Sequence, residues 1–402
     1  MKIFLSLLAI FFITDYANNF GQKPFVSERK AALLRPVLIV PGLASNRLLQ
    51  SRSSCFYGPR VWYAYSPTSR WNDCWISTIK LIYDNGTDTI DDGDGKIELD
   101  QFGWTNSMEN LMSDLPDQFP RANVFRKMVN HLKTKGFVKG KTLFGIPQDW
   151  RKSVTDVKSD YYANFYGVLE SAVSQTGEKA VVVCHSYGCI NLAEFIKRYP
   201  KEQLTDKIHK IITLAAPWGG SISALRAILS GDNLGKWHHS YTVYNLVQRT
   251  FTSFVHLLPS EDVPKKDPIV WINAVPYNIY EMDKIFEKAK LDKKLLKSRN
   301  KIATLINEFD KLNGTVSIDC ICGDEVETLT SLRYPTEKLS NATLITTSNK
   351  KGDGTVGYDS LSLCEKKTYM NFTVIKNLNH SYIIQEEAIF DRIVEVATLT
   401  NE

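Results

Sequence analysis

The segment AVVVCHSYGC at residues 180–189 carries the strongest structural signal in this chain. It starts with four apolar residues, most of them with high strand propensity. The following CINLAEFIKRYP has the apolar spacing of a helix that Pro200 ends. A serine stands between the two patterns. They therefore predict a buried strand that turns at once into a helix, with the Ser186 hydroxyl exposed at the turn.

This arrangement is the nucleophile elbow of the α/β-hydrolase fold, in which the N–H after the serine stabilises an oxyanion. Ser186 is the expected nucleophile, and the backbone N–H of Tyr187 is one expected oxyanion donor. The second donor should follow an early strand, and the Leu43 N–H after PVLIVPG fits that position. The first elbow position holds Cys184 instead of glycine, but cysteine is compact. The alternative is an ordinary serine in a strand–helix turn.

The other catalytic partners should follow the serine in the order carboxylate, then histidine. His380 is the only histidine after residue 256, and it follows an expected strand. Asp353 lies upstream of it in the loop GDGTV. This carboxylate would orient the imidazole that takes the serine proton. A surface histidine and a turn aspartate are the alternatives, but elbow, order and loop contexts together favour a Ser186–Asp353–His380 triad.

Strand and helix patterns alternate along the rest of the chain, which favours a mostly parallel sheet covered on both faces. Strands are expected at 36–40, 180–184, 208–214, 317–322 and 372–375, and helices at 124–132, 161–173, from the elbow to 199, and at 383–397. Two stretches break this rhythm and are expected to be insertions in the core. The expected core segments are 31–54, 104–217 and 314–402, and the insertions are 55–103 and 218–313.

The composition is that of a globular protein, with 43% hydrophobic and 23% charged residues among 402. The formal net charge is +5, but no lysine or arginine block indicates nucleic-acid binding. Lys2 precedes an apolar run at 3–13 that is too short to span a bilayer. Residues 1–20 are therefore expected to be a signal peptide, and a retained N-terminal anchor is the alternative.

Glycosylation sequons and cysteines agree with entry into the secretory pathway. A sequon at Asn379 lies beside His380 and is expected to stay unmodified. Seven cysteines allow disulfides in that compartment, and their odd number leaves at least one free thiol. The expected glycosylation sites are Asn85, Asn313, Asn341 and Asn371.

No cofactor or metal is expected. The run DGDG at 92–95 looks like part of a calcium loop, but its alignment puts Ile90 and Gln101 at the first and last ligand positions. A hairpin turn is therefore expected there. The cysteines lack paired C-x-x-C spacing, and His238 and His239 have no cysteine near them in sequence, which disfavours structural zinc.

Several segments resemble the lecithin:cholesterol acyltransferase family, which includes lysosomal phospholipase A2. The resemblance runs from about residue 36 to the C-terminus, and PWGGS with SGDN after the elbow is specific to this family. The chain departs from its relatives at Leu43 and Ser45. The segments are PVLIVPG (36–42), DCWISTIKLIYD (73–84), PQDWR (147–151), CHSYGC (184–189), APWGGS (216–221), SGDN (230–233) and GDGTV (352–356).

The resemblance implies a two-step reaction in which a serine takes the acyl group of a phospholipid and passes it to water or a lipid alcohol. On the matching positions, Ser186, Asp353 and His380 form the triad, and Leu43 and Tyr187 give the oxyanion N–H groups. The expected partners are a phospholipid membrane or lipoprotein surface and a lipid alcohol. A monomer is expected, secreted or in the lysosomal lumen. The alternatives are a dedicated phosphatidylcholine-sterol acyltransferase and a catalytically inactive lipid-binding protein on the same fold.

The resemblance also implies that the 55–103 insertion contacts membranes through a disulfide-enclosed loop. Aromatic residues with a polar edge suit the membrane interface, although a local mini-core is the alternative. The expected membrane-contacting residues are Trp62, Tyr63, Tyr65 and Trp71. The implied disulfides are Cys55–Cys74 and Cys320–Cys364, which leaves Cys184, Cys189 and Cys322 free and the elbow open to thiol reagents.

The 218–313 insertion would be a cap that includes a lid at 218–250. Trp218 would cover the pocket, and Asp232 of SGDN would belong to the same lid. Glycines at 219, 220 and 231 are hinge-capable positions. A packed helical cap without movement is the alternative.

Overall fold

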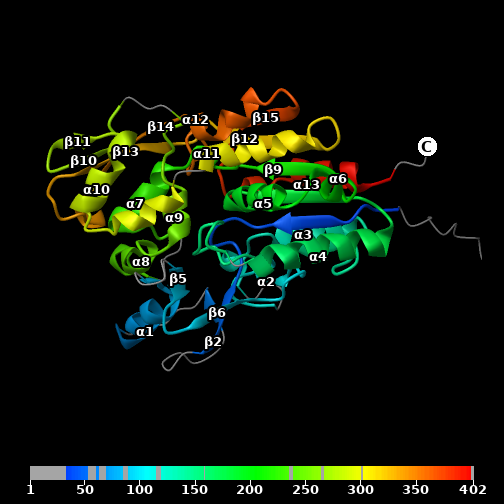
Figure 1. The fold of residues 1–402 in the computed structure, drawn as a ribbon, viewed down its shortest axis with the longest axis horizontal. Helices are drawn as coiled ribbons and strands as arrows, with labels where there is room; N and C mark the ends of the chain where they lie inside the picture. The colour runs from blue at the N-terminus through cyan, green and yellow to red at the C-terminus, as the bar shows by residue number, and fades with distance from the viewer. Residues whose placement is uncertain are drawn as a thin grey trace, which may run out of the picture. The chain divides into compact units, whose positions relative to one another are not determined.

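The computed structural model describes residues 33–52, 60–62, 69–84, 89–114, 119–157, 159–234, 239–263, 267–299 and 302–399 (Figure 1). The expected signal peptide at 1–20 and the sequon at Asn85 lie outside these ranges. The described residues form one compact unit that begins at about residue 32.

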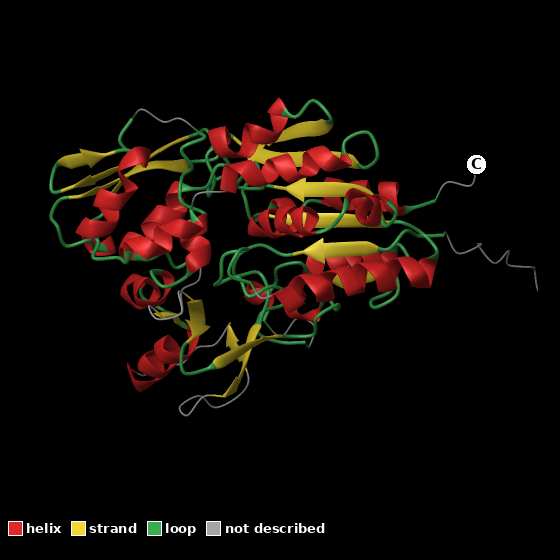
Figure 2. Ribbon diagram, viewed as in Figure 1, coloured by secondary structure: helices red, strands yellow, loops and turns green. Residues whose placement is uncertain are grey.

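The centre of this unit is a six-stranded sheet in which every neighbouring pair of strands is parallel. The strand arrows point the same way in Figure 2. All five predicted strands are present, and a short sixth strand adds to one edge. In spatial order the strands are β15 (Met370–Lys376), β12 (Ser317–Asp324), β9 (Ile208–Leu214), β8 (Ala180–His185), β1 (Val37–Val40) and β7 (Leu143–Gly145).

Helices cover both faces of this sheet. Alternate residues of β1 enter different cores, so Val37 packs with one set of helices and Leu38 with the other. On the Val37 face lie α3 (Arg126–Thr134) and α13 (Glu387–Ala397), and on the Leu38 face lie α4 (Ser159–Thr176) and α5 (Tyr187–Arg198). These four helices confirm the predicted ones. With a serine at the β8–α5 turn, the architecture is the α/β-hydrolase fold.

The first insertion forms two small sheets and one helix, and it takes in β2, which the predicted boundary at residue 55 had assigned to the core. Its elements are β2 (Leu48–Arg52), β3 (Arg60–Trp62) and β6 (Lys96–Leu99) in one sheet, β4 (Leu81–Asp84) and β5 (Thr89–Asp92) in the other, and helix α1 (Ser69–Ile79). The predicted hairpin turn at 92–95 is wrong. It joins β5, which pairs with β4, to β6, which pairs with β2, so the turn links two different sheets.

A buried arginine attaches this insertion to the core. Arg151 of the PQDWR segment is fully buried, and its guanidinium donates to Asp149, to Asp92 at the end of β5, and to the Ile79 carbonyl at the end of α1. Burial alone would raise the pKa of Asp149, but Arg151 outweighs it and holds that pKa at about 2. The ionised Arg151 therefore holds the carboxyl ends of β5 and α1 against the core.

The second insertion lies beyond the carboxyl ends of the central strands (Figure 1). Its main helices are α7 (Ile222–Ser230), α8 (Tyr241–Gln248), α9 (Thr252–His256), α10 (Met282–Lys288) and α11 (Ile302–Leu305). A four-stranded sheet joins β11 (Val275–Tyr277) and β10 (Val270–Ile272) to β13 (Thr328–Tyr334) and β14 (Ile345–Asn349). Residues 328–349, which the sequence boundary assigned to the core, thus pair with the cap.

The remaining helical segments are short. They are the α-helices α2 (Asn106–Glu109), α6 (Lys201–Thr205) and α12 (Tyr358–Leu361), and the 3-10 helices η1 (Pro120–Ala122), η2 (Ile279–Glu281), η3 (Lys293–Ser298), η4 (Ile306–Leu312), η5 (Asn341–Thr343), η6 (Ser362–Lys366) and η7 (Ile383–Gln385). Within the described ranges, no helix combines the length and the apolar character that crossing a bilayer requires.

The expected membrane contact of Trp62 is wrong. Its side chain is 1% exposed, packs edge-on against Trp150 at 4.9 Å, and donates to the Ala44 carbonyl. Trp62 thus belongs to the interior, as the mini-core alternative has it. Trp71 lies in α1, but its side chain, Tyr63 and Tyr65 are outside the described residues.

The predicted Cys320–Cys364 disulfide is present and joins β12 to η6. Cys74 is disulfide-bonded, while its expected partner Cys55 lies outside the described residues. Two of the expected glycosylation sites, Asn313 and Asn371, are exposed, and Asn341 is half-buried.

Candidate active site

The backbone at Ser186 has the strained conformation of a nucleophile elbow. Its φ is 53° and its ψ is −129°, a positive φ that non-glycine residues rarely adopt. A Cβ added to Gly188 would lie 2.4 Å from the Val40 carbonyl oxygen, and one added to Gly42 would lie 2.9 Å from the Ser186 Cβ. Glycine at both positions lets β1 and its following loop pass close to the serine.

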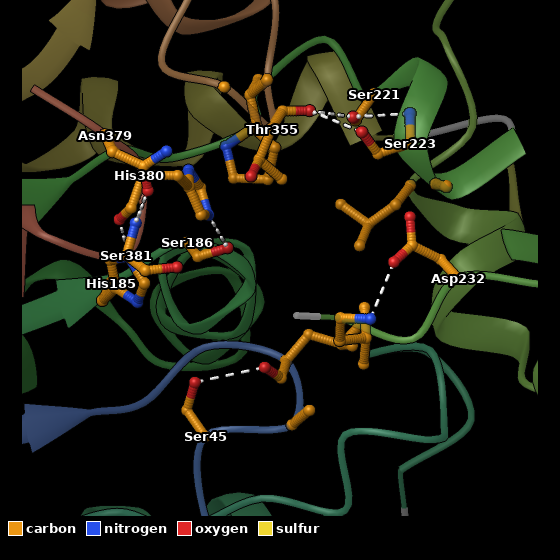
Figure 3. A pocket seen from close by; sticks show the side chains of 18 of the residues that line it. Ser45, His185, Ser186, Ser221, Ser223, Asp232, Thr355, Asn379, His380 and Ser381 are labelled. Atoms are coloured by element: carbon orange, nitrogen blue, oxygen red, sulfur yellow. Dashed lines mark hydrogen bonds between the residues drawn. The ribbon is translucent and has the colours of Figure 1, made fainter. Parts of the chain in front are cut away.

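The structure brings the three residues of the expected triad into hydrogen-bond contact. The His380 Nε2 lies 2.9 Å from the Ser186 Oγ, and its Nδ1 lies 2.6 Å from Asp353 Oδ2. Asp353 is fully buried and His380 is 7% exposed. Figure 3 shows His380 bonded to Ser186 at one side of the cavity. Ser186 follows β8 and His380 follows β15, both strands of the parallel sheet. Asp353 lies in the loop after β14 and reaches them because this loop forms a parallel bridge to Val326, just beyond the end of β12.

The loop after β14 fixes the orientation of the Asp353 carboxylate. Its Oδ1 accepts from the backbone N–H groups of Thr355 and Val356 at 3.0 and 2.8 Å, so Oδ2 is left for the imidazole. The His380 N–H donates to the Asp353 carbonyl at 2.7 Å. Backbone and side-chain hydrogen bonds therefore fix the position of Asp353 relative to His380.

His185, next to the nucleophile, supports His380 from the sheet. Its Nε2 lies 3.0 Å from the His380 backbone carbonyl oxygen. Burial and the neighbouring His380 lower the pKa of His185 to about 3. His185 is therefore neutral near pH 7 and donates one hydrogen bond.

Both expected oxyanion residues lie beside Ser186. Leu43 lines the cavity together with Ser186, and Tyr187 is the first residue of α5. The N–H groups of a first helical turn have no partner within the helix, so they are free to bind an anion. The buried Tyr187 hydroxyl accepts from the Val154 N–H and lies 3.1 Å from His256 Nδ1 in α9.

A cavity of about 550 Å³ opens at the serine, a size typical of ligand pockets. The cap supplies much of its wall through the start of α7 and the segment after it. The Ser221 and Ser223 hydroxyls donate to the Thr355 carbonyl, which joins α7 to the Asp353 loop (Figure 3). Asp232 also lines the cavity, where its carboxylate accepts from the Leu234 N–H at 2.7 Å.

The expected aromatic cover from Trp218 is wrong. Trp218 is completely buried against Phe309, and Pro217 lines the cavity in its place. The glycines expected as hinges are closely packed: a Cβ at Gly220 would lie 2.3 Å from the Leu258 carbonyl oxygen, and one at Gly231 2.0 Å from that of Tyr241. Close packing explains all three glycines, and Gly220 and Gly231 also have a positive φ.

The expectation that Cys184 and Cys189 are free is also wrong. They form a disulfide that spans the elbow from β8 to the first turn of α5. They are five positions apart in the sequence, and the strand-to-helix turn reverses the chain enough to bring both sulfurs together. Cys322 is free and buried, as expected. Burial, with Asp353 and Asp324 nearby, raises the pKa of this thiol to about 12, so it is unreactive.

Sequence reasoning missed the residues that support the site. His185 sits inside the elbow motif, but its contact with His380 joins residues 195 positions apart. Gln148 of PQDWR donates to the Pro41 carbonyl across 107 positions. Neither contact has a local sequence signal. Among the described residues, no group of three or more His, Cys, Asp or Glu side chains is placed to hold a metal ion.

Comparison with protein families gives one match, to the lecithin:cholesterol acyltransferase family over residues 56–311. Phosphatidylcholine-sterol acyltransferase of Mus musculus is 29% identical over 266 residues, which cover 62% of this chain and 58% of that protein. Lecithin-cholesterol acyltransferase-like 1 of Arabidopsis thaliana is 26% identical over 435 residues, covering 100% and 96%. Lysosomal phospholipase A and acyltransferase of Mus musculus is 33% identical over 162 residues, covering 40% and 38%.

The chain thus matches less than two thirds of the length of the mouse acyltransferase. Among solved structures, the Tle4–Tli4 complex contains a chain with a TM-score of 0.52 and 12% identity, and the match covers 91% of this chain and 99% of that one. At that identity the likeness concerns the fold alone.

Proposed function

This chain belongs to the lecithin:cholesterol acyltransferase family, and we propose that it is a serine-dependent phospholipase A and O-acyltransferase. The observation that carries the proposal is the bridge from Ser186 through His380 to Asp353 at the wall of a 550 Å³ cavity. A surface histidine or a turn aspartate would not be buried in this contact, and an inactive lipid-binding protein has no need of it.

In the first half-reaction, the Ser186 Oγ attacks the carbonyl carbon of a phospholipid acyl ester while His380 Nε2 takes the hydroxyl proton. The N–H groups of Leu43 and Tyr187 stabilise the resulting oxyanion. The bond from the carbonyl carbon to the glycerol oxygen then breaks. That oxygen receives the proton from His380, so lysophospholipid leaves and an ester on Ser186 remains.

In the second half-reaction, water or a lipid alcohol gives its proton to His380 and attacks the acyl carbon. The Ser186 oxygen leaves and recovers its proton, which yields a fatty acid or a new lipid ester. The names of the relatives support both outcomes, since one is a phospholipase A and acyltransferase and another transfers to sterol.

We extend the proposal to the insertions and the location. The 55–103 insertion would contact the lipid surface and the 218–313 insertion would cap the pocket, with 1–20 as a signal peptide that leads to secretion or to the lysosomal lumen. The disulfides Cys184–Cys189 and Cys320–Cys364 suit an oxidising compartment.

The test uses the purified full chain and its Ser186→Ala variant on phosphatidylcholine liposomes that contain either ceramide or a sterol. Mass spectrometry of the lipids would identify lysophospholipid, fatty acid and acylated alcohol, and a fluorophosphonate probe would label the nucleophile. We expect wild type to form lysophospholipid and to be labelled at Ser186. Equal product formation by the alanine variant would overturn the proposal, and the acylated alcohol formed would identify the acceptor.

A further inference from the structure

We infer that Gln148 is a positioning residue that holds both oxyanion donors in place through one buried amide. The inference rests on the proposed function and deepens it, because it assigns a role in acyl transfer to a residue outside the triad. Gln148 follows β7 and is 2% exposed. It makes hydrogen bonds to the loop after β1 and to helix α5.

The loop that carries Leu43 is held by Gln148 at both ends. The Gln148 side-chain Nε2 donates to the Pro41 carbonyl at 2.6 Å, two residues before Leu43. Three residues after Leu43, the Asn46 side chain pairs with both backbone groups of Gln148, accepting from its N–H and donating to its carbonyl at 3.1 Å each. The path of the loop from 41 to 46 is thereby tied to one residue.

The same amide also reaches the helix that begins with Tyr187. Asn191, one turn further along α5, donates its Nδ2 to the Gln148 Oε1 at 2.7 Å. Asn191 is 1% exposed, and its Nδ2 also lies 2.7 Å from the Tyr161 hydroxyl. Gln148 therefore bridges the element that carries Leu43 and the element that carries Tyr187.

The hydrogen-bonding partners allow only one orientation of the side-chain amides of Gln148 and Asn191. The Pro41 carbonyl oxygen can only accept, so the amide nitrogen of Gln148 must face it. The Gln148 oxygen must then face Asn191, which has to present its own nitrogen. A side chain that donates at one end and accepts at the other is needed at 148, and carboxylate or hydrocarbon cannot serve both ends.

This bridge matters for catalysis because oxyanion stabilisation depends on donors that are in place before charge develops. A displacement of a few tenths of an ångström at Pro41 would move the Leu43 N–H relative to that of Tyr187. The displacement should weaken binding of the transition state more than binding of the substrate, since the uncharged carbonyl of the substrate forms weaker hydrogen bonds with both N–H groups.

Two variants and one matched control test the inference. Gln148→Met has similar length but removes both bonds, and Gln148→Glu keeps the shape. Gln175→Glu makes the same change at an exposed position of α4. Each protein is assayed with a soluble short-chain nitrophenyl ester, which needs no membrane, and with an alkyl trifluoromethyl ketone, whose bound hemiketal oxyanion mimics the transition state. Circular dichroism checks folding.

For Gln148→Met we expect kcat/KM to fall by about 10- to 100-fold with little change in KM, within the range that losses of oxyanion donors give. The inhibition constant of the ketone should rise by the same factor. A residue with a merely structural role would lower the amount of folded protein without this parallel change. The Gln175→Glu control should match wild type.

For Gln148→Glu we expect a pH profile that wild type lacks. Burial raises the pKa of the new carboxyl, and its protonated form donates to the Pro41 carbonyl as the amide does. Activity should therefore be near that of wild type at mildly acidic pH and fall as the carboxyl ionises, reversibly within one preparation. This comparison needs no second folded variant.

The outcomes separate the two proposals. An inactive Ser186→Ala variant, with folded Gln148 variants that keep wild-type kcat/KM and pH profile, would overturn the role of Gln148 and leave the proposed function standing. Full activity of Ser186→Ala on the same ester would overturn the proposed function itself. Loss of turnover without weaker binding of the ketone would also reject the inference.

Discussion

The Nε2 of His185 lies 3.0 Å from the backbone carbonyl oxygen of His380, so the residue before the nucleophile supports the residue that activates it. The carbonyl oxygen can only accept, which fixes the His185 proton on Nε2. A pKa of about 3 keeps this imidazole in its neutral form. Strand β8 is thus hydrogen-bonded to the loop after β15.

Replacing His185 by leucine should lower kcat on a soluble ester by about fivefold, because a hydrogen bond of about 1 kcal/mol no longer fixes the His380 loop. His185→Gln is the matched variant, since its amide nitrogen can reach the position of the ring Nε2. We expect glutamine to recover most of the rate. Equal rates for leucine and glutamine would show that the bond has no effect on turnover.

Asp353→Asn should lower kcat by about 10³- to 10⁴-fold while the protein stays folded. The Thr355 and Val356 N–H groups would hold the asparagine oxygen, so its NH2 would face His380 Nδ1. The proton of the imidazole would then move to Nε2, where it blocks acceptance from Ser186. Steady-state kinetics measure this loss, with Asp359→Asn at an exposed position nearby as the control. Similar rates for both variants would contradict the orientation argument.

Stability should fall in mild acid through His256. Burial lowers the pKa of His256 to about 4, whereas the unfolded chain binds this proton near pH 6.5. The neutral His256 therefore contributes fully to the free energy of unfolding above about pH 6.5. This contribution is lost as the pH falls towards 4, and about 2 kcal/mol of it is gone by pH 5. In His256→Asn, the amide oxygen can accept from Tyr187 and does not titrate.

Urea unfolding at pH 7 and pH 5 measures this difference. The wild-type protein should lose more free energy of unfolding between the two pH values than His256→Asn. His185 has the same sign but is present in both proteins, so its effect cancels. A variant with the same pH slope as wild type would exclude His256 as the cause.

Arg151→Met should lower the free energy of unfolding by about 2 to 3 kcal/mol, since it removes the buried cation and leaves the half-buried Asp149 and Asp92 with Lys152 alone. The first insertion should become the site of early cleavage in limited proteolysis, because the Ile79 and Asp92 contacts are lost together. Arg121→Met, at an exposed position, is the control. An unchanged cleavage pattern would show that other contacts hold the insertion.

Local patterns were enough to predict much of this molecule. Apolar or β-branched runs marked five strands of the sheet, two of them continuously apolar, and the order serine, aspartate, histidine selected three residues that lie in contact. These signals are local or follow from parallel topology, in which strand ends meet at one edge. The predicted Cys320–Cys364 pair came instead from family resemblance.

The features that the sequence did not predict depend on contacts between segments far apart in the chain. The cap sheet pairs Val270 with Leu332, across 62 positions and through no repeated pattern. Trp62 belongs to an aromatic-rich segment typical of a membrane-contacting loop. It is buried nevertheless, because Trp150 of the core packs against it. Trp218 is buried for the same reason, against Phe309.

The bond between Cys184 and Cys189 has a consequence for how this protein is made. Neither cysteine has any exposed surface once β8 and α5 have packed, so an oxidant can reach the pair only while the chain is still open. If the protein is produced in a reducing cytosol, Cys184 and Cys189 would be buried as two free thiols beside the serine. An oxidant added after purification would then not reach them. The compartment of biosynthesis, more than the storage buffer, therefore determines which chemical form of the protein is obtained.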